Sequence, residues 1–167
     1  LQNELPDTAG LIEAALERGL RTVLNPSPFD ASLLKAPLER LYALIVNETE
    51  ARGFLADEAE GVEAAGLMAL LERRYPDVNL ILTLGSRGAC GRVPGAEPFF
   101  VPAVKMKAVD TTGAGDTFAG YAVAALAAGE DLRTAMNRAA KASAISVTRE
   151  GAATSIPRRS EVEALAV

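Results

Sequence analysis

Three short runs of mostly apolar residues mark the first half of the chain, at 22–24, 43–46 and 80–84. Between them, apolar residues recur at helical spacing over 9–18 and 62–74. Strands this short, without alternating polar residues, are typical of a parallel sheet covered on both faces. The alternation of strands and helices therefore predicts an α/β fold with three layers and a mostly parallel sheet.

The pattern changes after residue 88. Two short segments at 89–93 and 99–104 are separated by Pro94-Gly95 and predict a hairpin at the edge of the sheet. The other expected helices cover 33–41, where Pro37 interrupts the pattern, and then 117–128, 132–147 and 160–166. Two of these helices are rich in alanine, which predicts close helix packing.

Polar loops follow the expected strands, at 25–28, 47–50, 83–88 and 110–116. Ligands of open parallel sheets bind at the carboxyl ends of the strands, so we expect these loops to meet at one edge. Residues 1–4 resemble the end of a strand, and we expect the chain to begin in the middle of a fold.

Composition narrows the chemistry. The 167 residues include no His and a single Cys, Cys90, which excludes a Ser-His-Asp triad, a histidine metal site and an internal disulfide. A net charge of −5 argues against nucleic-acid binding through bulk charge. No apolar run is long enough to span a membrane, and the first residues lack the pattern of a secretory signal, so we expect a cytoplasmic protein.

The strongest chemical signal is DTTGAGDTFAG at 110–120. Gly113 and Gly115 allow a tight turn whose N–H groups point the same way, and a helix expected to begin near Asp116 adds the positive end of its dipole. Such a turn binds anions. A carboxylate beside it, Asp116, repels phosphate unless it acts as a base on a hydroxyl that attacks the bound phosphorus.

Three alternatives compete with this interpretation. A dinucleotide-binding fingerprint needs a third glycine where this chain has Phe118, and the Gly-Lys-Ser/Thr of a P-loop occurs nowhere. The third alternative is purely structural, with the glycines forming a tight loop and Asp116 capping a helix.

The chain resembles the ribokinase (pfkB) family of carbohydrate kinases over essentially its whole length. The motifs that carry this resemblance are DTTGAGDTF at 110–118, NPSP at 25–28, NETEA at 47–51, TLGSRG at 83–88 and SVTREGA at 146–152. They occur in the order found in that family.

The resemblance implies a role for each matching position. Asp116 is the catalytic base, which also contacts the sugar, and Glu4 is a second sugar contact. The anion hole comprises Gly113, Ala114 and Gly115. Nucleotide contacts comprise Asn47, Thr83, Leu84, Gly85, Ser86, Arg87, Gly88, Gly115, Asp116 and Ala140; alanine at 140 leaves only apolar or backbone recognition of the base.

The resemblance also implies two cations besides ATP. Glu50 would act on Mg²⁺ through water; the structural alternative is that it is the capping-box partner of Asn47, and the two roles can coexist. K⁺ would be held, mostly by backbone oxygens, at Asp110, Thr112, Ser146, Arg149, Gly151 and Ser155; the structural alternative for the segment around Gly151 is a plain loop.

The family implies about 300 residues, so this chain (1–167) corresponds to a C-terminal, nucleotide-binding portion that we expect to be inactive alone. The other half would carry most of the sugar pocket and the lid through which the protein dimerises. The implied reaction is ATP-dependent phosphorylation of a sugar hydroxyl, ribose to ribose 5-phosphate. The alternatives are 2-keto-3-deoxygluconate or fructose as acceptor, or a non-catalytic nucleotide-binding or scaffold protein.

Overall fold

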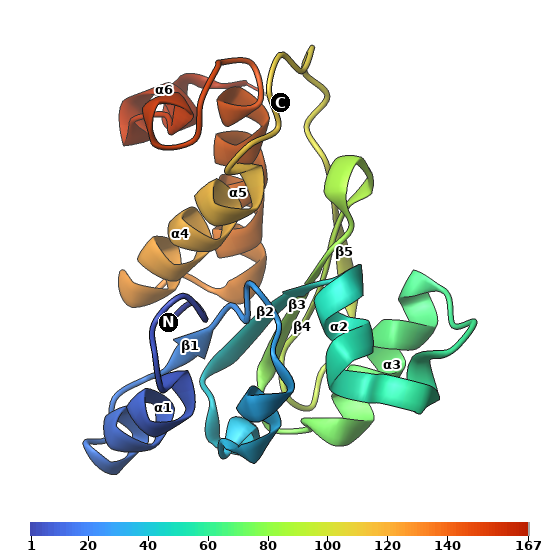
Figure 1. Ribbon diagram of the computed structural model, residues 1–167. Helices are drawn as coiled ribbons and strands as arrows, with labels where there is room; N and C mark the ends of the chain where they lie inside the picture. The colour runs from blue at the N-terminus through green and yellow to red at the C-terminus, as the bar shows by residue number, and fades with distance from the viewer. Residues whose placement is uncertain (167) are drawn as a thin grey trace. The chain divides into compact units, whose positions relative to one another are not determined.

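The computed structural model describes residues 1–166 and divides into two compact units (Figure 1). Unit 1 comprises Leu1–Leu84 and Cys90–Phe99. Unit 2 comprises Gly85–Ala89 and the chain from Phe100 onward.

A five-stranded sheet has the order β1-β2-β3-β4-β5. Its strands are β1 (Val23–Leu24), β2 (Ala43–Asn47), β3 (Asn79–Thr83), β4 (Gly88–Arg92) and β5 (Phe99–Pro102). The first three are parallel, with Leu24 opposite Leu44 and Asn47 opposite Thr83. An isolated parallel bridge joins Gln2 to Asn25 beside β1, as expected of a strand-like start. The predicted parallel strands and the edge position of β4 and β5 are confirmed.

Three α-helices and three 3₁₀ turns complete unit 1. They are α1 (Thr8–Glu17), η1 (Ala31–Lys35), η2 (Leu38–Arg40), α2 (Glu48–Leu55), η3 (Ala56–Ala59) and α3 (Ala64–Arg74). The Asp7 carboxylate caps α1 by accepting a hydrogen bond from the Gly10 N–H (3.1 Å). The interruption expected at Pro37 in the helix over 33–41 is confirmed, because Pro37 cannot donate a backbone hydrogen bond, but the two parts are separate 3₁₀ turns rather than α-helix.

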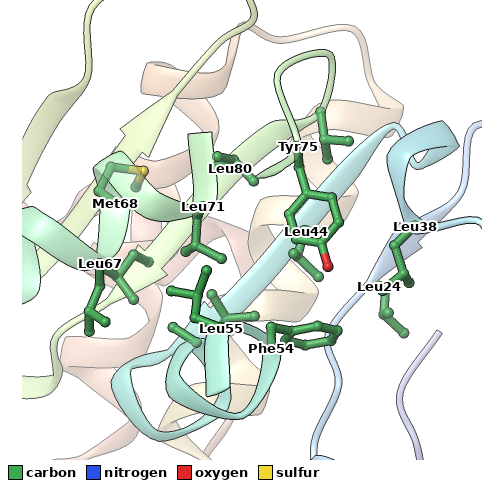
Figure 2. Packing of buried hydrophobic residues seen from close by; sticks show 14 of the residues in the cluster. Leu24, Leu38, Leu44, Phe54, Leu55, Leu67, Met68, Leu71, Tyr75 and Leu80 are labelled. Carbon is green, nitrogen blue, oxygen red and sulfur yellow. The ribbon is translucent and has the colours of Figure 1, made fainter. Parts of the chain in front are cut away.

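The core of unit 1 lies between the sheet and its helices (Figure 2). Leu44 and Leu80 project from neighbouring strands toward Phe54 of α2 and Leu71 of α3, and all four are buried. The Phe54 ring meets the Tyr75 ring edge to face, with centroids 6.4 Å apart. Residues on the other face of β2 and β3 are also buried. Burial on both faces explains why these strands read as unbroken apolar runs.

Unit 2 contains the turn η4 (Gly85–Arg87), the helices α4 (Ala114–Ala127) and α5 (Leu132–Ser146), the turn η5 (Ala153–Ser155) and α6 (Arg159–Ala164). The helices α4 and α5 pack along each other, and their small side chains, such as Ala122 and Ala139, are fully buried. Val162 of α6 packs on α5. Among residues 1–166, no helix is long and apolar enough to cross a membrane.

Two sequence-based expectations for unit 2 are wrong. Residues 103–109 form no strand, so the loop at 110–116 does not follow one. Helix α4 begins at Ala114 rather than near Asp116, because Gly113 takes a left-handed conformation (φ 72°) and acts as the N-cap. The glycine-rich sequence therefore already includes the first turn of the helix.

Candidate functional site

Three of the predicted loops meet at the carboxyl edge of the parallel strands in unit 1. The Asn25 side chain donates to the carbonyl of Ile45 (3.0 Å). The Thr83 hydroxyl donates to the carbonyl of Val46 (3.4 Å). Because Asn47 and Thr83 are in register at the ends of β2 and β3, unit 1 brings residues 25, 47 and 83 to one edge. This part of the expected clustering is confirmed.

Asn47 and Glu50 form the predicted capping box at the start of α2. The Glu50 N–H donates to Asn47 Oδ1 (2.8 Å), and the Asn47 N–H donates to Glu50 Oε2 (3.0 Å). The Asn47 side chain remains exposed, whereas Glu50 is only 5% exposed. The capping-box role of Glu50 is therefore confirmed. The nucleotide role of Asn47 stays a prediction.

The residues fit a magnesium site only in a limited way. Among the described residues, no three Asp, Glu or Cys side chains are grouped so as to hold a metal ion. The Glu50 carboxylate is a suitable hard ligand, but its Oε2 atom is held by the capping box. This arrangement is compatible with an outer contact through water and not with a cage of protein ligands. Glu4, the predicted sugar contact, lies exposed in the turn before α1.

Gly113 sets the geometry of the predicted anion-binding turn in unit 2. A Cβ atom at this position would lie 3.2 Å from Cα of Ala152, and its φ of 72° disfavours any other residue. The Ala114 N–H donates to the carbonyl of Thr111 (3.2 Å), and the Thr117 N–H donates to the carbonyl of Gly113 (2.8 Å). Gly115 lies between these two bonds, in the exposed first turn of α4.

Asp116 is the third residue of α4 and is exposed. It is not the N-cap, which is Gly113, so the alternative that Asp116 only caps the helix is wrong. A carboxylate in the first helical turn lies near the positive end of the helix dipole, an arrangement that stabilises the helix. The position of Asp116 fits a base beside an anion.

Asp110 ties the turn to the loop that follows α5. Its Oδ1 atom accepts hydrogen bonds from the Thr112 N–H (2.9 Å) and hydroxyl (2.7 Å). Its Oδ2 atom accepts one from the Gly151 N–H (2.9 Å). The Thr112 hydroxyl, with the backbone N–H groups of Thr112 and Gly151, lowers the pKa of the Asp110 carboxyl below its usual value. Asp110, Thr112 and Gly151, three of the predicted K⁺ positions, are thus joined directly.

The other predicted K⁺ positions are Ser146, the last residue of α5, and Arg149 and Ser155 in the segment that follows this helix. The Arg149 N–H donates to the carbonyl of Ser146 (3.1 Å), and the buried Ser155 hydroxyl donates to the carbonyl of Ala152 (2.7 Å). The Arg149 guanidinium is paired with Glu161, which leaves its carbonyl as the atom suited to a cation. A loop rich in carbonyl and hydroxyl oxygens fits a monovalent cation.

The remaining nucleotide positions are held by local structure. Residues Gly85–Arg87 form η4 in unit 2, while Thr83 and the buried Leu84 belong to unit 1. Gly88 begins β4 where a Cβ atom would lie 2.2 Å from the carbonyl oxygen of Val101, so only glycine fits. Ala140 is half-buried on α5. Convergence of all these residues in one cleft stays a prediction.

Three further residues near the turn were missed by the sequence analysis. The Ser143 hydroxyl of α5 donates to the carbonyl of Ala114 (3.0 Å). The Thr117 hydroxyl is buried and has no hydrogen-bond partner among the described residues. Glu161 pairs with Arg149, and this pairing, with the Arg158 N–H, lowers the pKa of the Glu161 carboxyl. Ser143 and Glu161 have partners 29 and 12 positions away, which leave no local pattern and explain why these two residues were missed.

Comparison with known proteins identifies the family. The chain matches the pfkB family carbohydrate kinase over residues 6–159. It belongs to the pfkB family of carbohydrate kinases. This pfkB chain is 35% identical to the ribokinase of Schizosaccharomyces pombe, over 98% of its own length and 52% of that protein. It therefore spans about half the length of the curated relatives it matches.

Solved structures confirm the ribokinase-like α/β fold of this pfkB chain. The Cryptococcus neoformans ribokinase in complex with ADP superposes with a TM-score of 0.85 at 36% identity, over 97% of this chain and 59% of that one. The Arabidopsis thaliana ribokinase complexed with ribose and ATP gives a TM-score of 0.82 at 26% identity, over 98% of this chain and 53% of that one. The chain thus represents part of a ribokinase-like fold.

Proposed function

We propose that the complete protein transfers the γ-phosphoryl group of ATP to a sugar hydroxyl, with ribose as acceptor and ribose 5-phosphate as product. The proposal rests on one observation above all: the Gly113–Asp116 turn opens α4 with a glycine N-cap and an exposed carboxylate in the first turn. The relation to ribokinases supports the choice of ribose. The alternatives within the family are 2-keto-3-deoxygluconate and fructose.

The turn suggests how the chemistry would proceed. The amide groups at the start of α4 would hold the phosphoryl oxygens, aided by the helix dipole. The Asp116 carboxylate would accept the proton of the sugar hydroxyl. The resulting oxygen attacks the γ-phosphorus, the bond to the β-phosphate oxygen breaks, and ADP leaves. The turn and the base share one rigid helix, which fixes their mutual geometry.

Two cations would assist the reaction, and both belong to the proposal. Mg²⁺ bound to ATP would neutralise phosphate charge, with Glu50 contacting its hydration shell. K⁺ would lie against the loop that Asp110 ties to Gly151, and its charge would support the neighbouring anion-binding turn. The chain's contribution is to hold these oxygens in place.

Replacing Asp116 tests the mechanism. Asp116→Asn preserves the size of the side chain but cannot accept the proton. In the complete protein, kcat should fall at least about a hundredfold, the scale of a positioned general base. The affinity for ATP should be unchanged or improved, because a negative charge beside the phosphates is removed. Sugar-dependent ADP release, screened over pentoses and hexoses, measures both the activity and the acceptor.

The control for Asp116 is Glu97→Gln, which neutralises an exposed carboxylate in the turn between β4 and β5. It should leave kcat unchanged. Normal turnover by Asp116→Asn would eliminate the catalytic role. An absence of ADP release with every sugar in the unaltered protein would favour the non-catalytic alternative.

A further inference from the structure

Helix α6 is fixed on the α4–α5 pair at both of its ends. Before its start, the Tyr121 hydroxyl of α4 donates to the carbonyl of Pro157 (2.6 Å). After its end, Lys141 Nζ of α5 donates to the carbonyl of Leu165 (2.7 Å). Between them Val162, which is buried, packs into α5. Although α6 is short, these contacts hold it in place against α4 and α5.

Glu161 connects α6 to the loop after α5 through its contact with Arg149. One carboxylate oxygen accepts a hydrogen bond from the Arg149 guanidinium. The other accepts the N–H of Arg158 at the start of α6 (2.7 Å). A single carboxylate thus joins the first turn of α6 to a side chain 12 residues earlier. The pair is half-buried, with side chains 37% and 39% exposed.

The segment from Arg149 to Gly151 is held from two directions. At one end, the Gly151 N–H donates to the Asp110 carboxylate, which also accepts a hydrogen bond from the Thr112 N–H in the predicted anion-binding turn. At the other end, the Arg149 side chain is paired with Glu161 on α6. The backbone between these two contacts carries the carbonyls that would face the cation. Removing the contact with Glu161 leaves the Arg149 end of the segment held by the bond from the Arg149 N–H to the carbonyl of Ser146.

We propose that Glu161 is a positioning residue for monovalent-cation binding by the loop after α5. Carbonyl oxygens select a cation by the size and rigidity of the space they enclose, so the held position of Arg149 determines how well K⁺ is bound. Glu161 acts through Arg149 and does not touch the cation. The inference rests on the proposed function, because that function supplies the cation site.

The test uses Glu161→Gln, which can still accept the Arg158 N–H but loses the charge that pairs with Arg149. The midpoint of thermal unfolding is measured for the chain against KCl, with choline chloride holding ionic strength constant. NaCl replaces KCl in a parallel series. The K⁺ concentration giving half of the midpoint shift should rise about two- to fivefold, within the range of a partly exposed ion pair. The same shift in half-saturating K⁺ should appear in the activity of the complete protein, with kcat at saturating K⁺ largely kept.

Two further variants separate positioning from general stability. Glu163→Gln removes a different ion pair on α6, that of Glu163 with Arg159 (2.6 Å), which has no link to the loop. It should leave half-saturating K⁺ unchanged. Arg149→Lys keeps the charge and should restore most of the K⁺ response that Arg149→Met loses.

The outcomes distinguish this inference from the proposed function. If K⁺ stabilises the unaltered chain and Glu161→Gln has the same half-saturating K⁺, Glu161 has no positioning role, while the kinase proposal stands. If Glu163→Gln weakens K⁺ as much as Glu161→Gln, the effect is general destabilisation of α6 and the inference is wrong. If K⁺ and Na⁺ have no effect on the unaltered chain, the loop holds no cation and the inference is overturned with it. Loss of sugar-dependent ADP release alone would instead refute the kinase proposal.

Discussion

Gly115 is a glycine that we expect the ligand, and not the fold, to require. Its backbone is not left-handed, and a Cβ atom there would meet no atom within 4 Å. Neither backbone conformation nor internal packing therefore requires glycine at this position. The space in front of its N–H is the space that a phosphoryl group would occupy in the proposed reaction.

Replacing Gly115 should separate stability from activity. Gly115→Ala should hold or slightly raise the midpoint of thermal unfolding, because alanine favours a helix more than glycine does. In the complete protein, kcat/KM for ATP should fall at least about tenfold, since a methyl group would stand where the phosphate approaches. Gly120→Ala is the matched control, because Gly120 lies on the same helix and also faces open space. If both variants keep full activity, the turn does not bind phosphate.

The Thr117 hydroxyl is a buried polar group with no hydrogen-bond partner among the described residues. An unsatisfied buried hydroxyl costs about 1–3 kcal/mol. Thr117→Val should therefore leave the free energy of unfolding of the chain unchanged or raise it, as measured by urea unfolding. Thr8→Val should lower it by about 1 kcal/mol, because the equally buried Thr8 hydroxyl donates to the carbonyl of Leu5. A clear loss of stability on Thr117→Val would mean that this hydroxyl has a partner.

At the scale of elements, the start of α2 combines a capping role with a predicted nucleotide role in one residue, Asn47. Asn47→Ser keeps a good N-cap, whereas Asn47→Ala loses it and should cost about 1 kcal/mol of stability. If Asn47 contacts the nucleotide, both variants should raise the KM for ATP of the complete protein, although only the alanine variant melts earlier. A raised KM confined to Asn47→Ala would reduce the residue to a cap.

Elements set by local chemistry were predictable from the sequence. The strands β2 and β3 are buried on both faces and therefore carry an unbroken apolar signal. The capping box of α2 is a local pattern of two residues three apart. The start of α4 was misplaced because glycine is compatible with many backbone conformations, and the sequence does not reveal that Gly113 is left-handed and serves as the N-cap.

The candidate site was predictable to a smaller extent, for the same reason. The turn at 110–116 is a compact motif, so its residues could be proposed from the sequence. The clamp from Asp110 to Gly151 and the pair of Arg149 with Glu161 join distant positions, and no spacing rule predicts them. The loop at 110–116 was expected to follow a strand directly. The segment 103–109 before it forms no strand, although it contains apolar residues such as Val109, which is 61% exposed.

At the scale of the whole molecule, the chain spans about half the length of the relatives it matches, and this predicts that it lacks activity by itself. We expect the 167-residue chain alone to release no ADP in the presence of ribose, because the sugar pocket would lie mostly in the other half of the family's fold. The complete protein should release ADP when ribose is added. A coupled assay of ADP release, run with the same pentoses and hexoses, compares the chain alone with the complete protein. Ribose-dependent turnover by the chain alone would show that it already contains a sufficient sugar site.

Tyr121, which donates a hydrogen bond to the carbonyl of Pro157, also offers an optical signal that belongs to unit 2 alone. The chain has no Trp and three Tyr, of which Tyr42 and Tyr75 lie in unit 1 and Tyr121 in unit 2. The ultraviolet fluorescence of unit 2 therefore comes from a single phenol ring, whose environment changes when α6 leaves α4. Subtracting the emission of a Tyr121→Phe protein from that of the unaltered protein isolates this ring. The difference follows the detachment of α6 without any added dye.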